Sequence, residues 1–282
     1  MRHKAVNQLA WEGTVMTESS RRDFLKVGAG VIVGAAVAGG LTAGAKKAEA
    51  AVSHPFGYIP LDVEATRLAG YNSYKGVVID GVKYAHCSFA TFNAIVGQLQ
   101  AADPYGPYAS IPTQMMMWGA AGVASFGSFC GALNGACAAL GLICNNTDAN
   151  AFISDLLTWY TETALPTNII APTGVLAQSI ARTTLCHNSV TNWCLASGFA
   201  SGSPERGERC ARLAGDVAAK TVEMLNNGRL GLPVPSSKTS CVQCHYTGTN
   251  YAGGQFTRGN EDCTACHVDI TKVPARGHHF KK

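Results

Sequence analysis

Charged side chains are scarce in this sequence. Asp, Glu, Lys and Arg make up 14% of the 282 residues, against 47% for the hydrophobic residues. This balance excludes a disordered chain, because disordered chains are highly charged and poor in apolar residues. The 31 glycines exclude a long coiled coil. We therefore expect a folded chain of one large or two modest domains.

A surplus of either charge is also lacking once the first fifty residues are set aside. Those residues hold 7 of the 22 basic and 4 of the 18 acidic residues, so 15 basic and 14 acidic residues remain. A nearly neutral chain offers no charge-based case for binding nucleic acid or an anionic membrane surface. The sequence also shows no Ser/His/Asp arrangement and no phosphate-binding loop, which removes two common grounds for predicting an enzyme.

Residues 1–50 have the features of an export signal. Ser20–Lys26 contains a twin-arginine motif, and Val27–Ala45 follows without a charge and with six glycines, as is typical of leaders on this export route. Ala48–Ala50 offers a small-x-small cleavage site, so we expect the mature chain to begin at about Ala51 in the periplasm. An uncleaved N-terminal anchor is the alternative, and Met16 is a second candidate start.

Cysteine occurs in an odd number, 11, so the cysteines cannot all pair within one chain. Four of them belong to two C-x-x-C-H motifs, at 241–245 and 263–267. Thiols at i and i+3 lie on one face of a helical turn, where both can form thioethers with one porphyrin, and the histidine that follows reaches the iron. The motifs predict two c-type haems held by Cys241, Cys244, Cys263 and Cys266, with His245 and His267 as proximal iron ligands.

A zinc ribbon is the alternative interpretation of these motifs. The 18 residues between Cys244 and Cys263 lie within the spacing of zinc ribbons. The histidine after each pair and the export signal favour haem.

Residues 231–282 show no periodicity long enough for a core of their own, so the haems must form it. Only 17 residues lie between His245 and Cys263, which keeps the porphyrins neighbours. Each iron needs a sixth ligand or has an open position. The candidate distal ligands are His279, His278, His86 and His54, with His187 as a further histidine of the main domain.

Residues 51–230 are expected to form a mainly α-helical, cysteine-rich domain, followed by the small irregular dihaem module at 231–282. Expected helical segments are 62–71, 81–102, 119–144, 150–163, 176–193 and 203–227. Ser203 is the predicted N-cap of the last helix, with Pro204 at its first position and Gly228 at its stop. Strand evidence is limited to 76–79.

Seven cysteines lie in this domain. Cys130, Cys137 and Cys144 recur every seven residues, which on one helix would place them about 10.5 Å apart, too far for two to join one small cluster. Cys87, Cys130, Cys186 and Cys210 fall on four different expected segments, as a [2Fe–2S] or [4Fe–4S] cluster would need. Disulfides and buried free thiols are the alternatives. The twin-arginine route, which carries folded proteins, favours a cofactor inserted before export.

The leader, the two haem motifs and the series Cys87, Cys130–Gly135, Cys186 and Cys210 together resemble the split-Soret cytochrome c family. The helical part is also similar to a broader group of redox proteins named for their spaced cysteines. The resemblance implies a homodimer with two closely stacked haems per subunit and bis-histidine ligation, in which a ligand crosses the dimer interface. It also implies an iron–sulfur cluster in the helical domain. Cys137, Cys144 and Cys194 have no place in the pattern.

Two functions follow from these observations. The first is a periplasmic electron carrier of anaerobic respiration that exchanges electrons with redox protein partners, and spare histidines that can saturate the irons favour it. The second is a redox enzyme that reduces a small ligand at an open haem iron or uses its cysteines in thiol redox chemistry.

Overall fold

The computed structural model describes residues 53–232 and, beyond them, residues 245, 248–255, 258–259, 261–262 and 265. All of these belong to one compact unit of the chain, Ala51–Lys282. Some of the predictions fall outside the described residues, namely those on residues 1–50, Cys241, Cys244, Cys263, Cys266, His267, His278 and His279.

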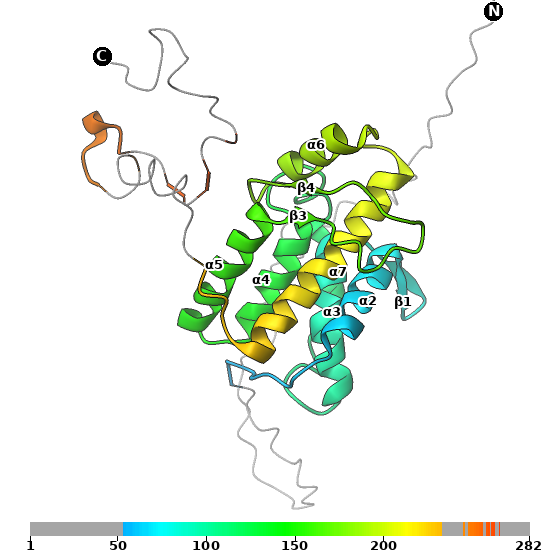
Figure 1. The fold of residues 1–282 in the computed structure, drawn as a ribbon. Helices are drawn as coiled ribbons and strands as arrows, with labels where there is room; N and C mark the ends of the chain where they lie inside the picture. The colour runs from blue at the N-terminus through cyan, green and yellow to red at the C-terminus, as the bar shows by residue number, and fades with distance from the viewer. Residues whose placement is uncertain are drawn as a thin grey trace, which may run out of the picture. The chain divides into compact units, whose positions relative to one another are not determined.

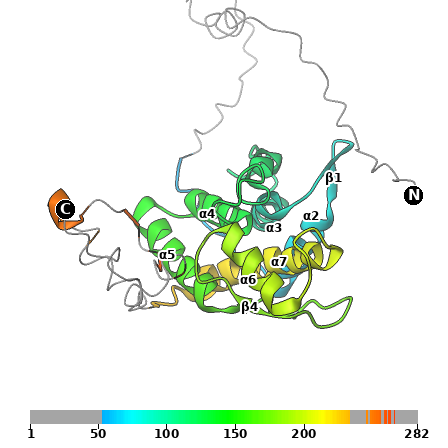
Figure 2. The same ribbon diagram turned by 90° about the horizontal axis from the view of Figure 1, so that it is seen from above.

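The described part of the chain is mainly α-helical, which confirms the predicted fold class (Figures 1 and 2). The helices are α2 (Val63–Lys75), α3 (Cys87–Ala102), α4 (Gly131–Ile143), α5 (Asn146–Glu162), α6 (Cys186–Ser197) and α7 (Pro204–Asn227), with short 3₁₀ turns η1 (Thr113–Gly119) and η2 (Tyr251–Gly253). The strands pair antiparallel, β1 (Val77–Ile79) with β2 (Val82–Tyr84) and β3 (Ala164–Leu165) with β4 (Ser179–Ile180).

Helix α7 is the centre of the fold and packs against α2, α3, α4 and α5. The predicted start is confirmed, because the Ser203 side chain accepts the N–H of Arg206 and Pro204 is the first helical residue. The helix ends before Gly228, as predicted. Close approach of α2 to α7 depends on glycine, since a Cβ atom on Gly215 would lie 2.5 Å from the carbonyl oxygen of Arg67.

Two clusters of buried apolar side chains form the core. One joins α4, α5 and α7 through residues such as Leu133, Leu156 and Val217. The other joins α3, α4 and α7 through residues such as Phe92 and Val222. Because α4 and α7 contribute to both clusters, the helices form one continuous packed body, which fixes the positions of the helix ends that carry the cysteines.

The expected boundaries of three helices are wrong. Residues 81–86 form β2 and a turn, so α3 begins only at Cys87. Residues 120–130 precede α4 as a loop, and residues 176–185 precede α6 as coil and β4. Apolar residues at helical spacing suggested longer helices, but they pack here as segments of extended chain and tight turns.

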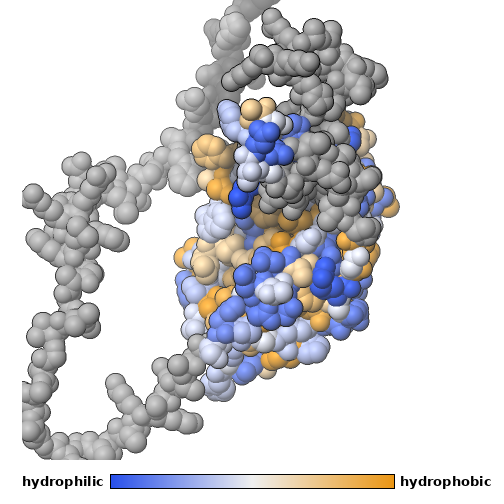
Figure 3. All heavy atoms as spheres, turned by 90° about the vertical axis from the view of Figure 1, so that its left-hand side faces the viewer, coloured by the Kyte–Doolittle hydropathy of each residue, from blue (hydrophilic) through white to orange (hydrophobic). Residues whose placement is uncertain are grey.

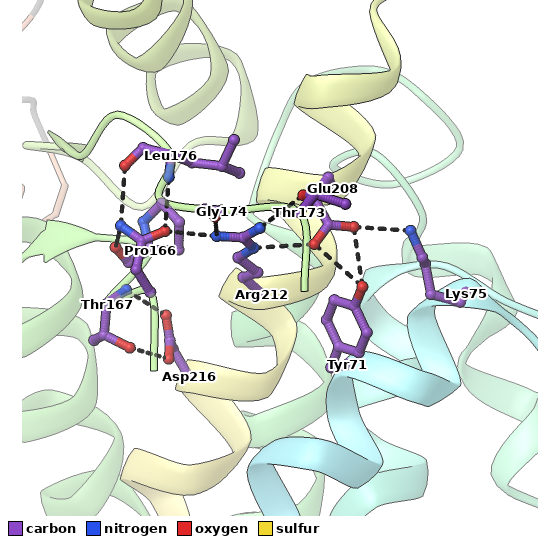
Figure 4. Close-up of polar contacts among 11 residues, drawn as sticks. Tyr71, Lys75, Pro166, Thr167, Thr173, Gly174, Leu176, Glu208, Arg212 and Asp216 are labelled. Atoms are coloured by element: carbon purple, nitrogen blue, oxygen red, sulfur yellow. Dashed lines mark hydrogen bonds and ion pairs between the residues drawn. The ribbon is translucent and has the colours of Figure 1, made fainter. Parts of the chain in front are cut away.

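A buried polar network fastens the segment between α5 and α6 to α7 (Figure 4). Arg212, only 2% exposed, donates to Glu208, to the Asn168 side chain and to the carbonyl oxygen of Gly174. Glu208 also accepts hydrogen bonds from Tyr71 and Lys75 of α2. Arg212 therefore ties α7 to the 166–176 segment, while Glu208 ties it to α2.

None of the helices that the structure describes is long and apolar enough to cross a membrane.

Candidate functional site

Four cysteines of the helical domain, the candidate ligands named from the sequence, lie within electrostatic range of one another. Cys87 is the first residue of α3, Cys130 immediately precedes α4, Cys186 is the first residue of α6, and Cys210 lies within α7. The thiols are close enough to shift one another's pKa. Cys87 and Cys186 each interact electrostatically with Cys130 and Cys210. Cys186 also raises the pKa of Cys87. We call these four residues the thiol cluster.

Three of these cysteines stand at helix N-termini, where backbone N–H groups lack partners within the helix. The backbone N–H groups of Ala132 and Leu133 act to lower the pKa of Cys130, and that of Ala121 acts to lower the pKa of Cys87, against the larger effect of burial. Helix N-termini carry partial positive charge and favour negative charge nearby. The backbone is therefore arranged to favour anionic sulfur at this point of the fold.

A short antiparallel bridge brings two of the cysteines side by side. Phe129 pairs with Leu185, the N–H of Cys130 donates to the carbonyl oxygen of Thr184, and the N–H of Cys186 donates to that of Ser128. These residues are more than fifty positions apart in the sequence. The bridge therefore sets the spacing of the first residues of α4 and α6, and with it the spacing of their thiols.

Burial disfavours the charged form of three of the four cluster thiols. It raises the pKa of Cys87 to about 12 and that of Cys186 to about 12, with neighbouring cysteines adding to the effect. Burial also raises the pKa of Cys130, although a hydrogen bond with Tyr160 and the charge of Arg209 oppose it. Burial thus favours the neutral thiol at Cys87, Cys130 and Cys186, and a bound metal cation would have to displace their protons.

The loop 120–128 lies against the cluster and was not foreseen from the sequence. Six of its residues have positive φ, including the β-branched Val123 at 61° and Gly122 at 71°. A Cβ atom on Gly122 would lie 2.7 Å from the Cβ of Cys186, so only glycine permits this approach. Positive φ at Val123 is strained, and such strain persists only where surrounding structure imposes it.

The remaining cysteines of the domain take no comparable position. Cys137 lies within α4, and burial together with Cys130 raises its pKa to about 12. Cys144 caps the other end of α4, and Cys194 lies in α6. Only Cys130 of the seven-residue series belongs to the thiol cluster, as the spacing argument required. The geometry differs from the expectation, because Cys130 and Cys144 flank the helix rather than lie on it.

The donor set of the thiol cluster suits iron, since soft thiolates from several helices are its usual ligands in such sites. A buried nitrogen of Arg209, Nε, also has no hydrogen-bond partner beside the cluster. As they stand, however, no three His, Cys, Asp or Glu side chains within the described ranges are arranged to hold a metal ion. Metal binding would therefore require the thiols to deprotonate and turn toward one point.

His245, the predicted proximal ligand of the first haem motif, contacts the turn at 250–255 through its ring. Its Nδ1 is 2.8 Å from the carbonyl oxygen of Gly254. A carbonyl only accepts, so Nδ1 carries the proton and Nε2 is the nitrogen suited to a metal. Gly254 has φ of 88°, and a Cβ there would lie 3.1 Å from Nδ1. The turn at 250–255, closed by the Asn250 side chain accepting the N–H of Gly253, thus restrains the Nδ1 side of the ring.

The described candidate distal ligands lie apart from one another on the domain surface. His54 is exposed, and its Nε2 lies 2.6 Å from the carbonyl oxygen of Gly141. His86 is the N-cap of α3, is exposed, and packs its ring edge-on against Tyr74. His187 is exposed beside Cys186. The alternative role for His86, a hydrogen-bonded histidine of the core, is wrong, because His86 is exposed.

Residues that directly precede the second haem motif contact the helical domain near the thiol cluster. Glu261 accepts hydrogen bonds from the backbone N–H of Thr184, at 3.2 Å, and from its hydroxyl. Asp262 lies 3.6 Å from the guanidinium of Arg182. Sequence reasoning missed this contact, because isolated Thr, Arg and Glu residues carry no motif.

A pocket of about 290 Å³ opens at this contact, on the side of the molecule that carries α5. Figure 3 shows that polar and apolar residues are mixed on this side. Its walls are Asn150, Ile153, Ser154, Leu157, Thr158, Thr161, Arg182, Thr183, Thr184 and Glu261. The pocket is therefore bounded by α5, by the segment that leads into α6, and by a residue next to the second haem motif.

Comparison with known proteins finds a matching family model and a similar cytochrome. Residues 85–224 match a family described as "Putative redox-active protein (C_GCAxxG_C_C)"; the matched range contains all four residues of the thiol cluster. The chain is 32% identical over 273 residues to split-Soret cytochrome c of Desulfovibrio desulfuricans, which covers 88% of this chain and 94% of the relative.

A solved structure is similar as well. It is described as "a novel iron centre in the split-Soret cytochrome c from Desulfovibrio desulfuricans ATCC 27774", with a TM-score of 0.65 and 31% identity over 76% of this chain and 91% of that chain.

The predicted cofactor set requires correction. Two c-type haems with a [2Fe–2S] or [4Fe–4S] cluster were expected, but the iron centre of the solved relative is described as novel. The ordinary cluster types were inferred from the number and spread of cysteines, and those features do not define which iron species a group of thiols holds. Neither cluster type is retained, and the comparisons give no number of haems.

The identity extends over 88% of the chain, and the family match contains the segments of the thiol cluster. The chain therefore belongs to the split-Soret cytochrome c family, which gives it a redox, electron-carrying role.

Proposed function

We propose that this protein is an exported electron carrier that binds haem covalently at its C-x-x-C-H motifs. The observation that carries the proposal is the hydrogen bond between His245 Nδ1 and the Gly254 carbonyl, which prepares Nε2 of a motif histidine for iron. Haem bound there supplies one-electron redox chemistry. The chain's own contribution is to orient the ligand and to hold the attachment segment against the helical domain through Glu261.

Haems at the motifs are adjacent in this proposal, because only 17 residues separate His245 from Cys263. Each iron takes a histidine as its second ligand, from His278, His279, His86 or His54. Bis-histidine ligation gives a lower reduction potential than His/Met ligation. The exposure of His86 and His54 leaves both accessible to another chain, as a homodimer with a ligand crossing its interface requires.

Export by the twin-arginine route to the periplasm completes the proposed role. The basis is the Ser20–Lys26 motif and the charge-free stretch after it. In the periplasm the protein would pass single electrons between redox protein partners in anaerobic respiration.

The thiol cluster provides a second redox centre in this proposal. An iron site at Cys87, Cys130, Cys186 and Cys210 is supported by the novel iron centre of the solved relative, by the electrostatic proximity of the four thiols and by the three helix N-termini beside them. Iron held there supplies a further one-electron redox couple. The chain's own residues contribute sulfur ligands and compensating positive charge.

Spectroscopy and mass spectrometry of the exported protein test the haem proposal. Attachment predicts a haem mass retained under denaturing conditions and lost stepwise in Cys241→Ser/Cys244→Ser and Cys263→Ser/Cys266→Ser variants. A Soret band split in the wild type and single in either variant would support adjacent haems. Retention of zinc with no covalent haem would refute the proposal.

Binding of carbon monoxide distinguishes the carrier from the alternative of a redox enzyme. Two histidine ligands on each iron predict slow or no binding of carbon monoxide to the reduced protein. Rapid binding would favour an open iron that reduces a small ligand.

Molar mass in solution tests the homodimer, which predicts twice the mass of the mature chain.

A further inference from the structure

Arg209 is a fully buried residue beside the thiol cluster, and among the described residues no carboxylate balances its charge. It lies in α7 and is 1% exposed. Arg67 and Arg212, the other arginines buried in the described part of the chain, both form ion pairs, with Asp216 and Glu208 respectively. No ion pair with a carboxylate is found for Arg209 among the described residues.

The contacts of Arg209 point to sulfur and to hydroxyl groups instead. Nη2 donates to the Ser189 hydroxyl, at 2.7 Å, and Nη1 donates to the sulfur of Cys210, at 3.8 Å. Nε is buried without a partner. Cys130 is near enough to interact electrostatically, and Tyr160, hydrogen-bonded to Ser189, is a further neighbour. The guanidinium thus interacts with three of the four cluster cysteines, namely Cys130, Cys186 and Cys210.

A buried cation without a counter-ion is costly, because desolvation of a charge in a protein interior costs several kcal/mol that only a nearby anion offsets. Neutral thiols and hydroxyl groups do not supply that anion. Metal ligation does, because four thiolates carry more negative charge than the two or three positive charges of an iron ion. The partial positive charge at the N-termini of α3, α4 and α6 acts in the same direction.

We propose that Arg209 is the internal counter-cation of the thiol cluster and selectively stabilises the iron-loaded, anionic form of the site. This inference rests on the proposed iron site and assigns to it a residue outside the cysteine pattern. Arg209 is a positioning and charge-compensating residue; the sulfurs remain the ligands. A merely structural Arg209, which only joins α7 to Ser189 of α6, would stabilise the iron-free and iron-loaded forms equally.

Two substitutions separate these roles. Arg209→Met removes the charge and keeps most of the length of the side chain, whereas Arg209→Lys keeps the charge. Arg212→Met is the matched control, because Arg212 is equally buried on the same helix but already paired with Glu208. Each variant is prepared as the full exported protein with its haem, under anaerobic conditions, with the thiol cluster either freed of iron by a chelator or loaded with ferrous iron.

Chelator competition measures iron affinity, and urea unfolding measures the stability of the iron-free form. Arg209→Met is expected to weaken iron binding by roughly 10–100-fold, the range for residues that support metal ligands, while the iron-free protein is as stable as the wild type or more stable. Arg209→Lys is expected to keep most of the affinity. Arg212→Met is expected to destabilise the iron-free protein and leave the affinity of the folded protein unchanged.

Unchanged iron affinity in folded Arg209→Met would overturn the inference, as would equal losses in the Lys and Met variants. The inference would also be overturned if iron-free Arg209→Met were destabilised as much as Arg212→Met while its iron affinity stayed at the wild-type value. A wild-type protein that takes up no iron would refute the proposed iron site itself. That outcome is read from the wild type alone, so it is distinguishable from failure of the role of Arg209.

Discussion

Thr184 holds Glu261 through both its backbone N–H and its hydroxyl, while its own carbonyl oxygen accepts the N–H of Cys130. One residue thus contacts the thiol cluster on one side and the segment entering the second C-x-x-C-H motif on the other. Residues 261 and 184 are far apart in the sequence, so this relationship is tertiary. It places a haem-attachment segment next to a second candidate redox centre.

Replacement of Glu261 by Ala should release that segment from the helical domain. Hydrogen bonds to a carboxylate contribute about 1.5–3 kcal/mol each, so the bound fraction should fall by roughly tenfold or more. Limited proteolysis should then cut the C-terminal segment faster while the helical domain stays resistant. Glu223→Gln, which alters a surface ion pair with Lys220, is the control. Equal rates of cleavage in both variants would show that Glu261 does not hold the C-terminal segment against the helical domain.

Gly254→Ala should disturb the ring of His245. The added Cβ would lie 3.1–3.2 Å from Nδ1 and Cε1, and φ at this position is 88°. Positive φ costs alanine about 1 kcal/mol, and the contact adds a shift of the ring. The reduction potential and absorption spectrum of the haem at the first motif should change.

Gly228→Ala separates the two effects of that substitution. Gly228 has a similar φ of 93° but nothing within 4 Å of an added Cβ. It should lower stability by a comparable amount and leave the haem spectrum unchanged. If both variants gave the same spectrum as the wild type, the proposed role of the Gly254 carbonyl would be lost.

Glu208→Gln should destabilise the domain, with a characteristic pH dependence. Although burial opposes its charge, hydrogen bonds from Lys75, Arg212 and Tyr71 hold the pKa of Glu208 below its ordinary value of 4.5. The folded pKa lies below the unfolded one, so the stabilisation is complete above about pH 4.5 and is lost as the pH falls through the folded pKa. The substitution leaves the buried Arg212 without its carboxylate, so a loss of about 3 kcal/mol is expected at pH 7.

Urea unfolding at pH 7 and at pH 3 measures this effect. The difference between wild type and Glu208→Gln should be large at pH 7 and smaller in acid, where the wild-type carboxyl is also protonated. A difference that grows toward low pH would contradict the assigned direction of the pKa shift.

Cys130→Ala should lower the iron content of the purified protein, because Cys130 interacts electrostatically with Cys87 and Cys186 and stands at the N-terminus of α4. Cys194→Ala, in α6 but outside the thiol cluster, is the matched control and should retain wild-type iron. The measurement is total iron by metal analysis, from which the iron of the haem is subtracted. Loss of iron from both variants, or from neither, would count against the assigned ligands.

The helical content and the haem motifs were predictable because their signals are local. Ser203, Pro204 and Gly228 mark the ends of α7 through rules that operate within one turn of helix. Local periodicity failed at 120–130, where apolar and glycine residues suggested helix but the chain forms a loop with positive φ. The loop is imposed by contact with Cys186 and by the bridge between Phe129 and Leu185, and neither contact has a local signature.

The sequence by itself determined the mainly helical class, the spacing of the C-x-x-C-H motifs and the fact that Cys130, Cys137 and Cys144 cannot serve one small site together. Each of these follows from covalent geometry or helical periodicity, which act over a few residues. Only the tertiary structure decided that three cluster cysteines stand at helix N-termini, that Arg209 faces them without a carboxylate, and that Thr184 joins the cluster to Glu261. Those relationships depend on how distant helix ends pack together, and packing of α3, α4, α6 and α7 is a property of the whole fold.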